Sequence, residues 1–284
     1  MLLGSVWFSP WTFGLFFATV QAVMLWEFYR MMRAGGYAPM TWLGTFTSVL
    51  LFLIGTILAF LPEASSFFIG PAFVSVSGDI SRFFLNQFVG EYALLYLIAL
   101  LALVPLLIIN QIKGWSQETK PFQNIALTLG GFLYIGMPMS MLNLIAWDKQ
   151  HYDYRRIFAL LFLIWASDIG AYAAGKTFGK HKMAPQISPG KTWEGWAGGF
   201  VLTLVVGWAV GFLLPDMSLA HRLVAAGVVA VFAPLGDLAE SMLKRSVGVK
   251  DSGSIMPGHG GLLDRFDAFL LVLPVLALLQ LLAG

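Results

Sequence analysis

Two carboxylates, a hydroxyl and an ammonium recur at helical spacing in the last quarter of the chain. The positions i, i+3, i+4 and i+7 of one helix face are occupied by Asp237, Glu240, Ser241 and Lys244. Acidic groups near the end of an apolar helix suit the binding of a hard cation and an anionic substrate. The same stripe also fits a solvated helix end with an i, i+4 pair between Glu240 and Lys244. Both interpretations remain open at this point.

A glycine-rich segment follows this stripe and carries three groups of interest, Lys250, Asp251 and His259. Its Gly260 and Gly261 permit backbone conformations that other residues rarely adopt. Successive backbone N–H groups in such a loop can point at phosphate oxygens. A plain turn between two helices is the alternative.

The segment ends in two more carboxylates, Asp264 and Asp267, at i, i+3 spacing with Arg265 between them. Acidic residues in a first helical turn also favour the helix dipole, which is the simpler explanation. The chain has no cysteine and only four histidines, so thiolate sites are excluded. Mg²⁺ takes oxygen ligands and shares them with substrate phosphates, so a carboxylate–Mg²⁺ site is the inorganic chemistry that these residues favour.

Two earlier clusters contain further polar residues within apolar surroundings. Asp168 lies inside an apolar run, and Lys176 follows it after two helical turns. Lys191 and Thr192 begin a later apolar run, where they can contact phosphates. A basic loop with a helix cap at Thr192 explains the second cluster equally well.

The amino-acid composition indicates which kind of secondary structure carries these polar residues. Hydrophobic residues make up 58% of the chain and charged residues 11%, against about 45–50% and about 25% in soluble domains. Disordered and nucleic-acid-binding classes are excluded for want of charge, and we expect an all-α integral membrane protein. The bundle should contain about eight transmembrane helices, within a range of seven to nine. The predicted spans are Trp11–Met31, Thr41–Leu61, Tyr92–Ile112, Phe122–Leu144, Arg156–Ala174, Trp196–Leu214, Arg222–Leu243 and Phe266–Leu282.

Basic residues predict the orientation of these spans. Twelve Lys and Arg residues fall on one side and five on the other, which places the polar clusters at the cytoplasmic face. We expect residues 1–284 to form a single polytopic membrane domain. Within it, 1–115 would supply a lipid-facing scaffold and 156–284 the cytoplasmic-side catalytic site. The segment Pro62–Glu91 is predicted to be an interfacial loop, with a ninth short span as the alternative.

The last cluster resembles the signature of the phosphatidate cytidylyltransferases, also called CDP-diacylglycerol synthases. The resemblance rests on residues 241–245 (SMLKR), Lys250-Asp251 and residues 257–267 (PGHGGLLDRFD). Residues 188–195 (SPGKTWEG) and 236–241 (GDLAES) add to it. The family implies an all-helical membrane enzyme that joins CTP and phosphatidic acid into CDP-diacylglycerol with a divalent metal, and releases pyrophosphate.

The resemblance also suggests roles. The implied catalytic residues are Asp237, Lys244, Arg245, Asp251 and Asp264. Phosphates of CTP or phosphatidate would be bound by Asp168, Lys176, Lys191, Thr192, Lys250, His259, Gly260, Gly261 and Arg265. One or two Mg²⁺ ions would be held by Asp237 and Asp264 as first choices, and by Glu240 and Asp267.

The implied partners are CTP, phosphatidic acid and membrane lipid, without nucleic acid, and the family also allows a homodimer. The short chain favours a bacterial inner membrane with the site facing the cytoplasm. A CTP-dependent polyprenol-type lipid kinase and an ether-lipid cytidylyltransferase remain alternatives within related chemistry. An ion-coupled transporter is the alternative from another class, but it predicts polar residues spread through several spans at the midplane.

Overall fold

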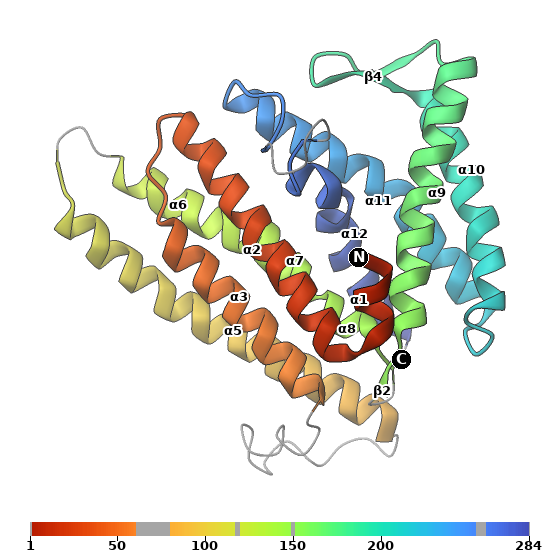
Figure 1. Ribbon diagram of the computed structural model, residues 1–284, viewed down its shortest axis with the longest axis horizontal. Coiled ribbons are helices and arrows are strands. Elements are labelled where there is room, and N and C mark those ends of the chain that lie inside the picture. The colour runs from red at the N-terminus through yellow and green to blue at the C-terminus, as the bar shows by residue number, and fades with distance from the viewer. Residues whose placement is uncertain (1, 61–79, 117–119, 149–150, 254–259, 284) are drawn as a thin grey trace. The chain divides into compact units, whose positions relative to one another are not determined.

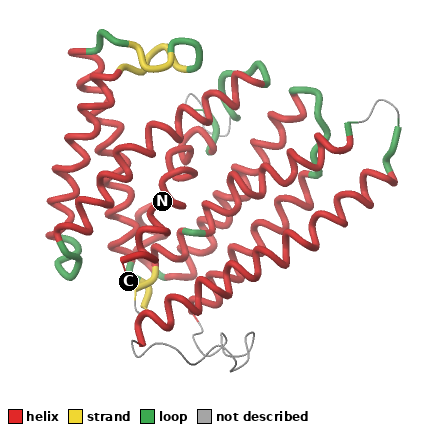
Figure 2. The backbone as a smooth tube through the Cα atoms, turned by 180° about the vertical axis from the view of Figure 1, so that it is seen from behind, coloured by secondary structure: helices red, strands yellow, loops and turns green. Residues whose placement is uncertain are grey.

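The structure is a computed structural model that describes residues 2–60, 80–116, 120–148, 151–253 and 260–283. Helices dominate the described chain, with two short hairpins (Figures 1 and 2). The chain divides into two compact units, Met1–Tyr152 and Asp153–Ala283.

The first unit is built from helices and one two-stranded ladder. Its elements are α1 (Leu2–Phe8), α2 (Pro10–Ala34), α3 (Thr41–Phe60), α5 (Ile80–Lys113), α6 (Pro121–Gly131), the π-helix η2 (Phe132–Gly136), α7 (Met137–Ser140), α8 (Leu142–Ala146), β1 (Trp147–Asp148) and β2 (His151–Tyr152). The strands β1 and β2 pair antiparallel.

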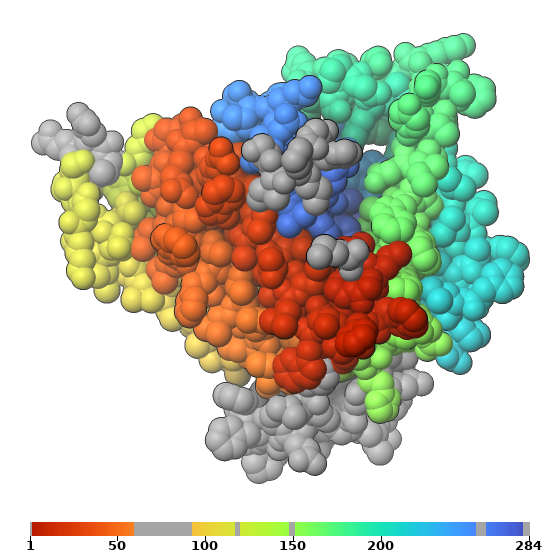
Figure 3. Space-filling model, in the orientation of Figure 1, coloured from red at the N-terminus to blue at the C-terminus, as the bar shows by residue number. Residues whose placement is uncertain are grey.

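The helix α2 begins at a capping box. The Ser9 side chain accepts from the Thr12 backbone N–H, the Thr12 hydroxyl accepts from the Ser9 N–H, and Pro10 opens the helix. The helix then packs along α3 (red and orange in Figure 3). Because the interior is apolar, its buried polar groups pair with one another: Gln21 Nε2 donates to Ser48 Oγ over 2.9 Å.

The second unit carries most of the predicted polar residues. Its elements are α9 (Tyr154–Phe178), β3 (Lys182–Ala184), β4 (Ser188–Thr192), α10 (Trp193–Ala209), the 3₁₀-helix η3 (Val210–Phe212), α11 (Leu219–Ser246) and α12 (Leu263–Ala283). The strands β3 and β4 form an antiparallel hairpin between α9 and α10, which extends past the ends of both helices (Figure 1).

Glycines let the helices of the second unit approach closely. A Cβ at Gly170 of α9 would lie 2.7 Å from the Gly198 carbonyl oxygen of α10. A Cβ at Gly236 of α11 would lie 2.7 Å from the Asp267 carbonyl oxygen of α12. Both positions require glycine because real Cβ atoms do not come this close to backbone. The first contact lies two residues after Asp168, and the second lies next to Asp237, so glycine packing brings acidic residues of three helices toward one another.

Seven helical segments of the described chain are long and apolar enough to cross a membrane, within the predicted range of seven to nine. They are Pro10–Ala34, Thr41–Ala59, Ala93–Lys113, Pro121–Ala146, Tyr154–Phe178, Trp193–Phe212 and Leu219–Ser246. The helix α12 contains the predicted eighth span but is not among them, and its first turns carry three charged residues. The fold is therefore an all-α polytopic membrane bundle.

One predicted boundary is wrong. Residues 80–91, which we expected in an interfacial loop, belong to α5, so the span predicted from Tyr92 begins within a longer helix. Residues 80–89 contain no proline or glycine, and Gly90 lies within the helix without ending it. The earlier part of that predicted loop, residues 62–79, lies outside the described residues.

Candidate active site

The first polar cluster joins the β3–β4 hairpin to α11. Lys191 Nζ lies 2.7 Å from Asp237 Oδ2, and it also donates to the Pro234 carbonyl oxygen over 2.9 Å. On the other side of the carboxylate, Ser241 Oγ donates to Asp237 Oδ1 over 3.2 Å. Lys191 and Asp237 side chains are 22% and 45% exposed, so solvent and a ligand can reach the pair.

A proline inside α11 contributes to the position of the hairpin. Pro234 has no N–H, so the carbonyl of Ala230 lacks its usual partner within the helix. The Trp196 indole donates to that carbonyl oxygen over 3.0 Å, which ties α10 to α11. The hydrogen bond from Lys191 to Pro234 lies one turn further along α11. Two residues flanking the start of α10 are therefore anchored on the same face of α11.

Two more carboxylates surround this cluster. Asp168 of α9 and Asp267 of α12 both interact electrostatically with Asp237, and Lys191 offsets part of the negative charge. The four residues come from four different elements of the second unit. Their arrangement leaves net negative charge beside one ammonium, which favours a cation or a cation-bound phosphate.

The second polar cluster is a buried ion triad between α11 and α12. Lys244 Nζ lies 2.5 Å from Glu240 Oε2 and 2.6 Å from Asp264 Oδ1. Glu240 has a fully buried side chain, and those of Lys244 and Asp264 are 11% and 13% exposed. The i, i+4 pair of the simpler interpretation is present, but the pair is buried rather than solvated, because Asp264 of α12 packs against it.

Asp264 also anchors the connection that precedes α12. Its Oδ2 accepts from the Ser252 hydroxyl over 2.8 Å and from the Gly261 N–H over 2.7 Å. Burial raises the pKa of the Asp264 carboxyl, but the hydrogen bonds from Lys244 and Gly261 outweigh it and lower the pKa to about 2. Asp264 is therefore ionised at neutral pH, and both its oxygens already accept hydrogen bonds.

A third contact holds the hairpin at its other end. Glu194 accepts from the backbone N–H groups of Lys180 and His181, and its Oε1 lies 2.6 Å from His181 Nδ1. Next to it, Thr192 Oγ1 accepts from the Gly195 N–H and caps α10. The helix-cap interpretation of Thr192 is thus confirmed. A role in phosphate binding remains a prediction for this buried residue.

Most of the remaining candidate residues lie at the protein surface. Lys176, Arg245, Lys250, Asp251 and Arg265 are exposed. Lys176 Nζ lies 5.6 Å from the centre of the Tyr172 ring, and Arg245 donates to the Val249 carbonyl oxygen over 3.3 Å. His259 lies outside the described residues.

A model of the cytidylyltransferase family matches residues 1–282, nearly the whole chain. The chain belongs to the cytidylyltransferase family. The match includes α9–α12 and both polar clusters, so the clusters belong to the matched region.

Three relatives of this chain carry the name phosphatidate cytidylyltransferase. A Staphylococcus haemolyticus protein named phosphatidate cytidylyltransferase is 40% identical over 165 residues, 58% of this chain and 62% of that protein. A Bacillus subtilis protein of the same name is 42% identical over 178 residues, 62% of this chain and 65% of that protein. One from Staphylococcus aureus is 38% identical over 214 residues, 73% of this chain and 80% of that protein. The matches to the first two thus span less than two thirds of those proteins.

The carboxylates around Lys191 have the donor chemistry that Mg²⁺ prefers. Asp168, Asp237 and Asp267 supply hard oxygen ligands with mutually repelling charges. Among the described side chains, no three acidic or histidine groups converge closely enough to enclose a metal ion. The donor set therefore fits an ion that takes part of its coordination from substrate phosphates and water.

Two residues of the candidate site were absent from the predicted set. Ser252 is buried and binds Asp264, and Glu194 anchors the hairpin that carries Lys191. An acidic residue in the first turn of a helix was the available signal for Glu194, but its partners lie thirteen and fourteen residues earlier. No spacing rule connects Ser252 with a carboxylate twelve residues later.

Proposed function

We propose that this chain is a phosphatidate cytidylyltransferase, which transfers the cytidylyl group of CTP to phosphatidic acid and releases pyrophosphate. The observation that carries the proposal is the Lys191–Asp237 pair, flanked by Asp168 and Asp267, on residues that match the family signature. The names of the relatives from Staphylococcus and Bacillus support the same substrates.

The proposed reaction needs positioning and charge rather than a strong base. A phosphate oxygen of phosphatidate attacks the α-phosphorus of CTP, and the bond from that phosphorus to the oxygen bridging to the β-phosphate breaks. Pyrophosphate leaves with the bonding electron pair. The attacking phosphate is already anionic at neutral pH, so Lys191 serves by reducing repulsion between the reacting phosphates.

We further propose that the cofactor is Mg²⁺, as one ion or two, held by Asp168, Asp237 and Asp267. When bound, it supplies positive charge to the phosphates. Asp264 and Glu240 are less suited to this role than the sequence suggested, because both lie within hydrogen-bonding range of Lys244 and Asp264 also holds the Ser252 hydroxyl. We assign these two carboxylates to fixing Lys244 and the connection before α12.

Exposed cations near the clusters are available for the triphosphate. Arg245 lies in the last turn of α11 and Lys250 shortly after it, and both are exposed, so they can contact CTP arriving from water. This arrangement supports a site at the membrane surface, facing the cytoplasm of a bacterial inner membrane, with the lipid substrate entering from the bilayer. A homodimer is the assembly that the family resemblance allows.

Acceptor chemistry tests the proposal. Purified protein in detergent is supplied with CTP, Mg²⁺ and either phosphatidate, diacylglycerol or a polyprenol. We expect one pyrophosphate for each CDP-diacylglycerol with phosphatidate, and no turnover with the two alcohols, because they lack the attacking phosphate. Formation of CDP and a phosphorylated alcohol would instead identify a lipid kinase.

A further inference from the structure

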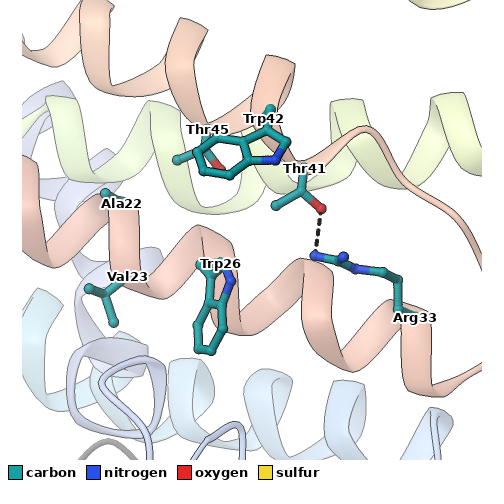
Figure 4. Close-up of a pocket in the computed structure, with 7 residues that line it drawn as sticks. All are labelled: Ala22, Val23, Trp26, Arg33, Thr41, Trp42 and Thr45. Atoms are coloured by element: carbon teal, nitrogen blue, oxygen red, sulfur yellow. Dashed lines mark hydrogen bonds between the residues drawn. The ribbon is translucent and has the colours of Figure 1, made fainter.

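A groove of about 360 Å³ lies between α2 and α3 of the first unit (Figure 4). Its lining is mainly apolar, and a single charged side chain lies among the residues that form it. These residues are Ala22, Val23, Trp26 and Arg33 of α2, and Thr41, Trp42 and Thr45 of α3. None of them belongs to the candidate active site, whose described residues are all in the second unit.

One end of the groove is cationic. Arg33 Nη2 donates to Thr41 Oγ1 over 2.9 Å, as the dashed line in Figure 4 marks. One turn earlier, the Arg30 guanidinium lies 5.4 Å from the centre of the Trp26 ring. Within the described chain, neither arginine forms an ion pair with a carboxylate. An arginine and a hydroxyl at the same helix end form a donor set for a phosphate.

The apolar part of the groove has the length of one bilayer leaflet. Ala22 and Arg33 are eleven residues apart on α2, which corresponds to about 16 Å at about 1.5 Å per residue. Half of a hydrocarbon core of about 30 Å is about 15 Å. Trp42 is 88% exposed and Trp26 is 42% exposed, so both indoles present apolar surface that protein does not cover.

The groove also contains a polar atom without a partner. The Thr45 hydroxyl is buried and makes no hydrogen bond to any described residue. It lies one helical turn from Thr41 on the same face of α3. Below a phosphate at Arg33, a glycerolipid carries its ester carbonyls, which accept hydrogen bonds.

We propose that this groove binds one membrane phospholipid with an anionic headgroup. The phosphate lies at Arg33 and Thr41, and one acyl chain lies along Ala22, Val23 and Trp42. Charge complementarity selects this occupant over a zwitterionic lipid, because Arg30 and Arg33 form no ion pair with a described carboxylate that would compete with the headgroup. The inference does not depend on the proposed enzymatic activity.

Tryptophan quenching tests the proposal on the full-length protein in detergent. The protein is titrated with phosphatidylglycerol brominated on its acyl chains, and separately with the equivalent phosphatidylcholine. The wild type should reach half-maximal quenching at a lower concentration of phosphatidylglycerol, and Trp42→Phe should lose the selective part of the signal. Arg33→Gln should raise that concentration at least about tenfold, since a charge-assisted hydrogen bond is removed.

Three further variants separate the groove from general effects. Val23→Phe fills the groove without a change in charge and should abolish selective quenching. Thr41→Val keeps the shape and the charge, and should weaken phosphatidylglycerol binding even if Arg33→Gln fails to fold. Lys113→Gln removes an exposed cation that does not line the groove, and should leave the titration unchanged.

The proposal would be overturned if the two lipids quenched the wild type equally, or if quenching were unchanged in both Arg33→Gln and Thr41→Val. The groove would then hold only non-selective boundary lipid. Loss of a dimer in Val23→Phe, measured by light scattering, with lipid quenching unchanged, would also overturn it. The groove would then be the seat of a second copy of this chain.

Discussion

Lys191 Nζ and Asp237 Oδ2 lie 2.7 Å apart and connect the β3–β4 hairpin to α11. The two residues are separated by a whole apolar helix, α10, in the sequence. The pair is partly exposed, so it is available to a substrate, whereas the nearby Lys244 is enclosed by two carboxylates. The two lysines thus differ in exposure. We propose that the exposed Lys191 acts on substrate and that the buried Lys244 stabilises the fold.

Neutralising either partner of the exposed pair should abolish most activity without unfolding the protein. We expect Lys191→Gln and Asp237→Asn each to lower kcat/KM for CTP by about 10²–10³, the range for loss of one group that stabilises developing charge. Steady-state rates with phosphatidate measure this. Arg155→Gln is the matched control, since it breaks an ion pair of 2.8 Å in the same unit that has no proposed role. Near-wild-type rates in both test variants would remove the pair from the mechanism.

The buried triad should contribute to stability more than to catalysis. Lys244→Met leaves Glu240 and Asp264 buried without their cation, which should cost about 3–5 kcal/mol of unfolding free energy. The melting temperature in detergent measures this loss. Lys182→Met, at an exposed position of β3, should change stability by no more than about 0.5 kcal/mol. Equal melting temperatures for the two variants would contradict the structural role of Lys244.

Alanine substitutions at two glycines test how tightly Asp264 is held in place. Gly248 and Gly260 have φ values of +73° and +80°, so alanine is strained at both, by about 1–2 kcal/mol. Only at Gly260 would the new Cβ also meet Asp264 Oδ2, at 2.8 Å, whereas Gly248 has open space. Gly260→Ala should therefore lower the melting temperature more than Gly248→Ala. Equal losses would show that the contact with Asp264 is not important.

Metal removal should separate the carboxylates by role. A chelator should abolish activity and Mg²⁺ should restore it. Asp168→Asn and Asp267→Asn should raise the Mg²⁺ concentration for half-maximal activity at least about tenfold. Asp264→Asn should lower the melting temperature with an unchanged Mg²⁺ requirement in the protein that remains folded. A raised Mg²⁺ requirement in Asp264→Asn alone would return Asp264 to the role of metal ligand.

Much of the fold was predictable because the membrane imposes simple requirements. Runs of about twenty apolar residues predicted the α2, α3, α9, α10 and α11 spans to within a few residues. The start of α5 was missed because residues 80–91 mix phenylalanines with polar groups, and hydropathy does not report helix outside the apolar stretch. The cap of α10 was readable locally, as Thr192 shows.

The sequence indicated several residues of the two polar clusters but not their pairing, and it missed Ser252 and Glu194. Helical spacing placed Asp237 and Lys244 on one face, yet each pairs across to a different element. The pairing of Lys244 with Asp264 depends on the close approach of α11 and α12 at Gly236, a contact between positions about thirty residues apart. One face of α11 thus contributes residues to both polar clusters. The helical spacing of these residues does not show which cluster each one joins.

The central claim is transfer of a cytidylyl group, and the position of the label in CTP tests it most directly. Wild-type protein and Asp237→Asn are incubated with phosphatidate, Mg²⁺ and CTP that is labelled either at the α- or at the γ-phosphate. We predict that α-label enters the lipid fraction with the wild type and not with Asp237→Asn, while γ-label remains in water as pyrophosphate. Transfer of γ-label to lipid, or no transfer of either label by folded wild-type protein, would contradict the account.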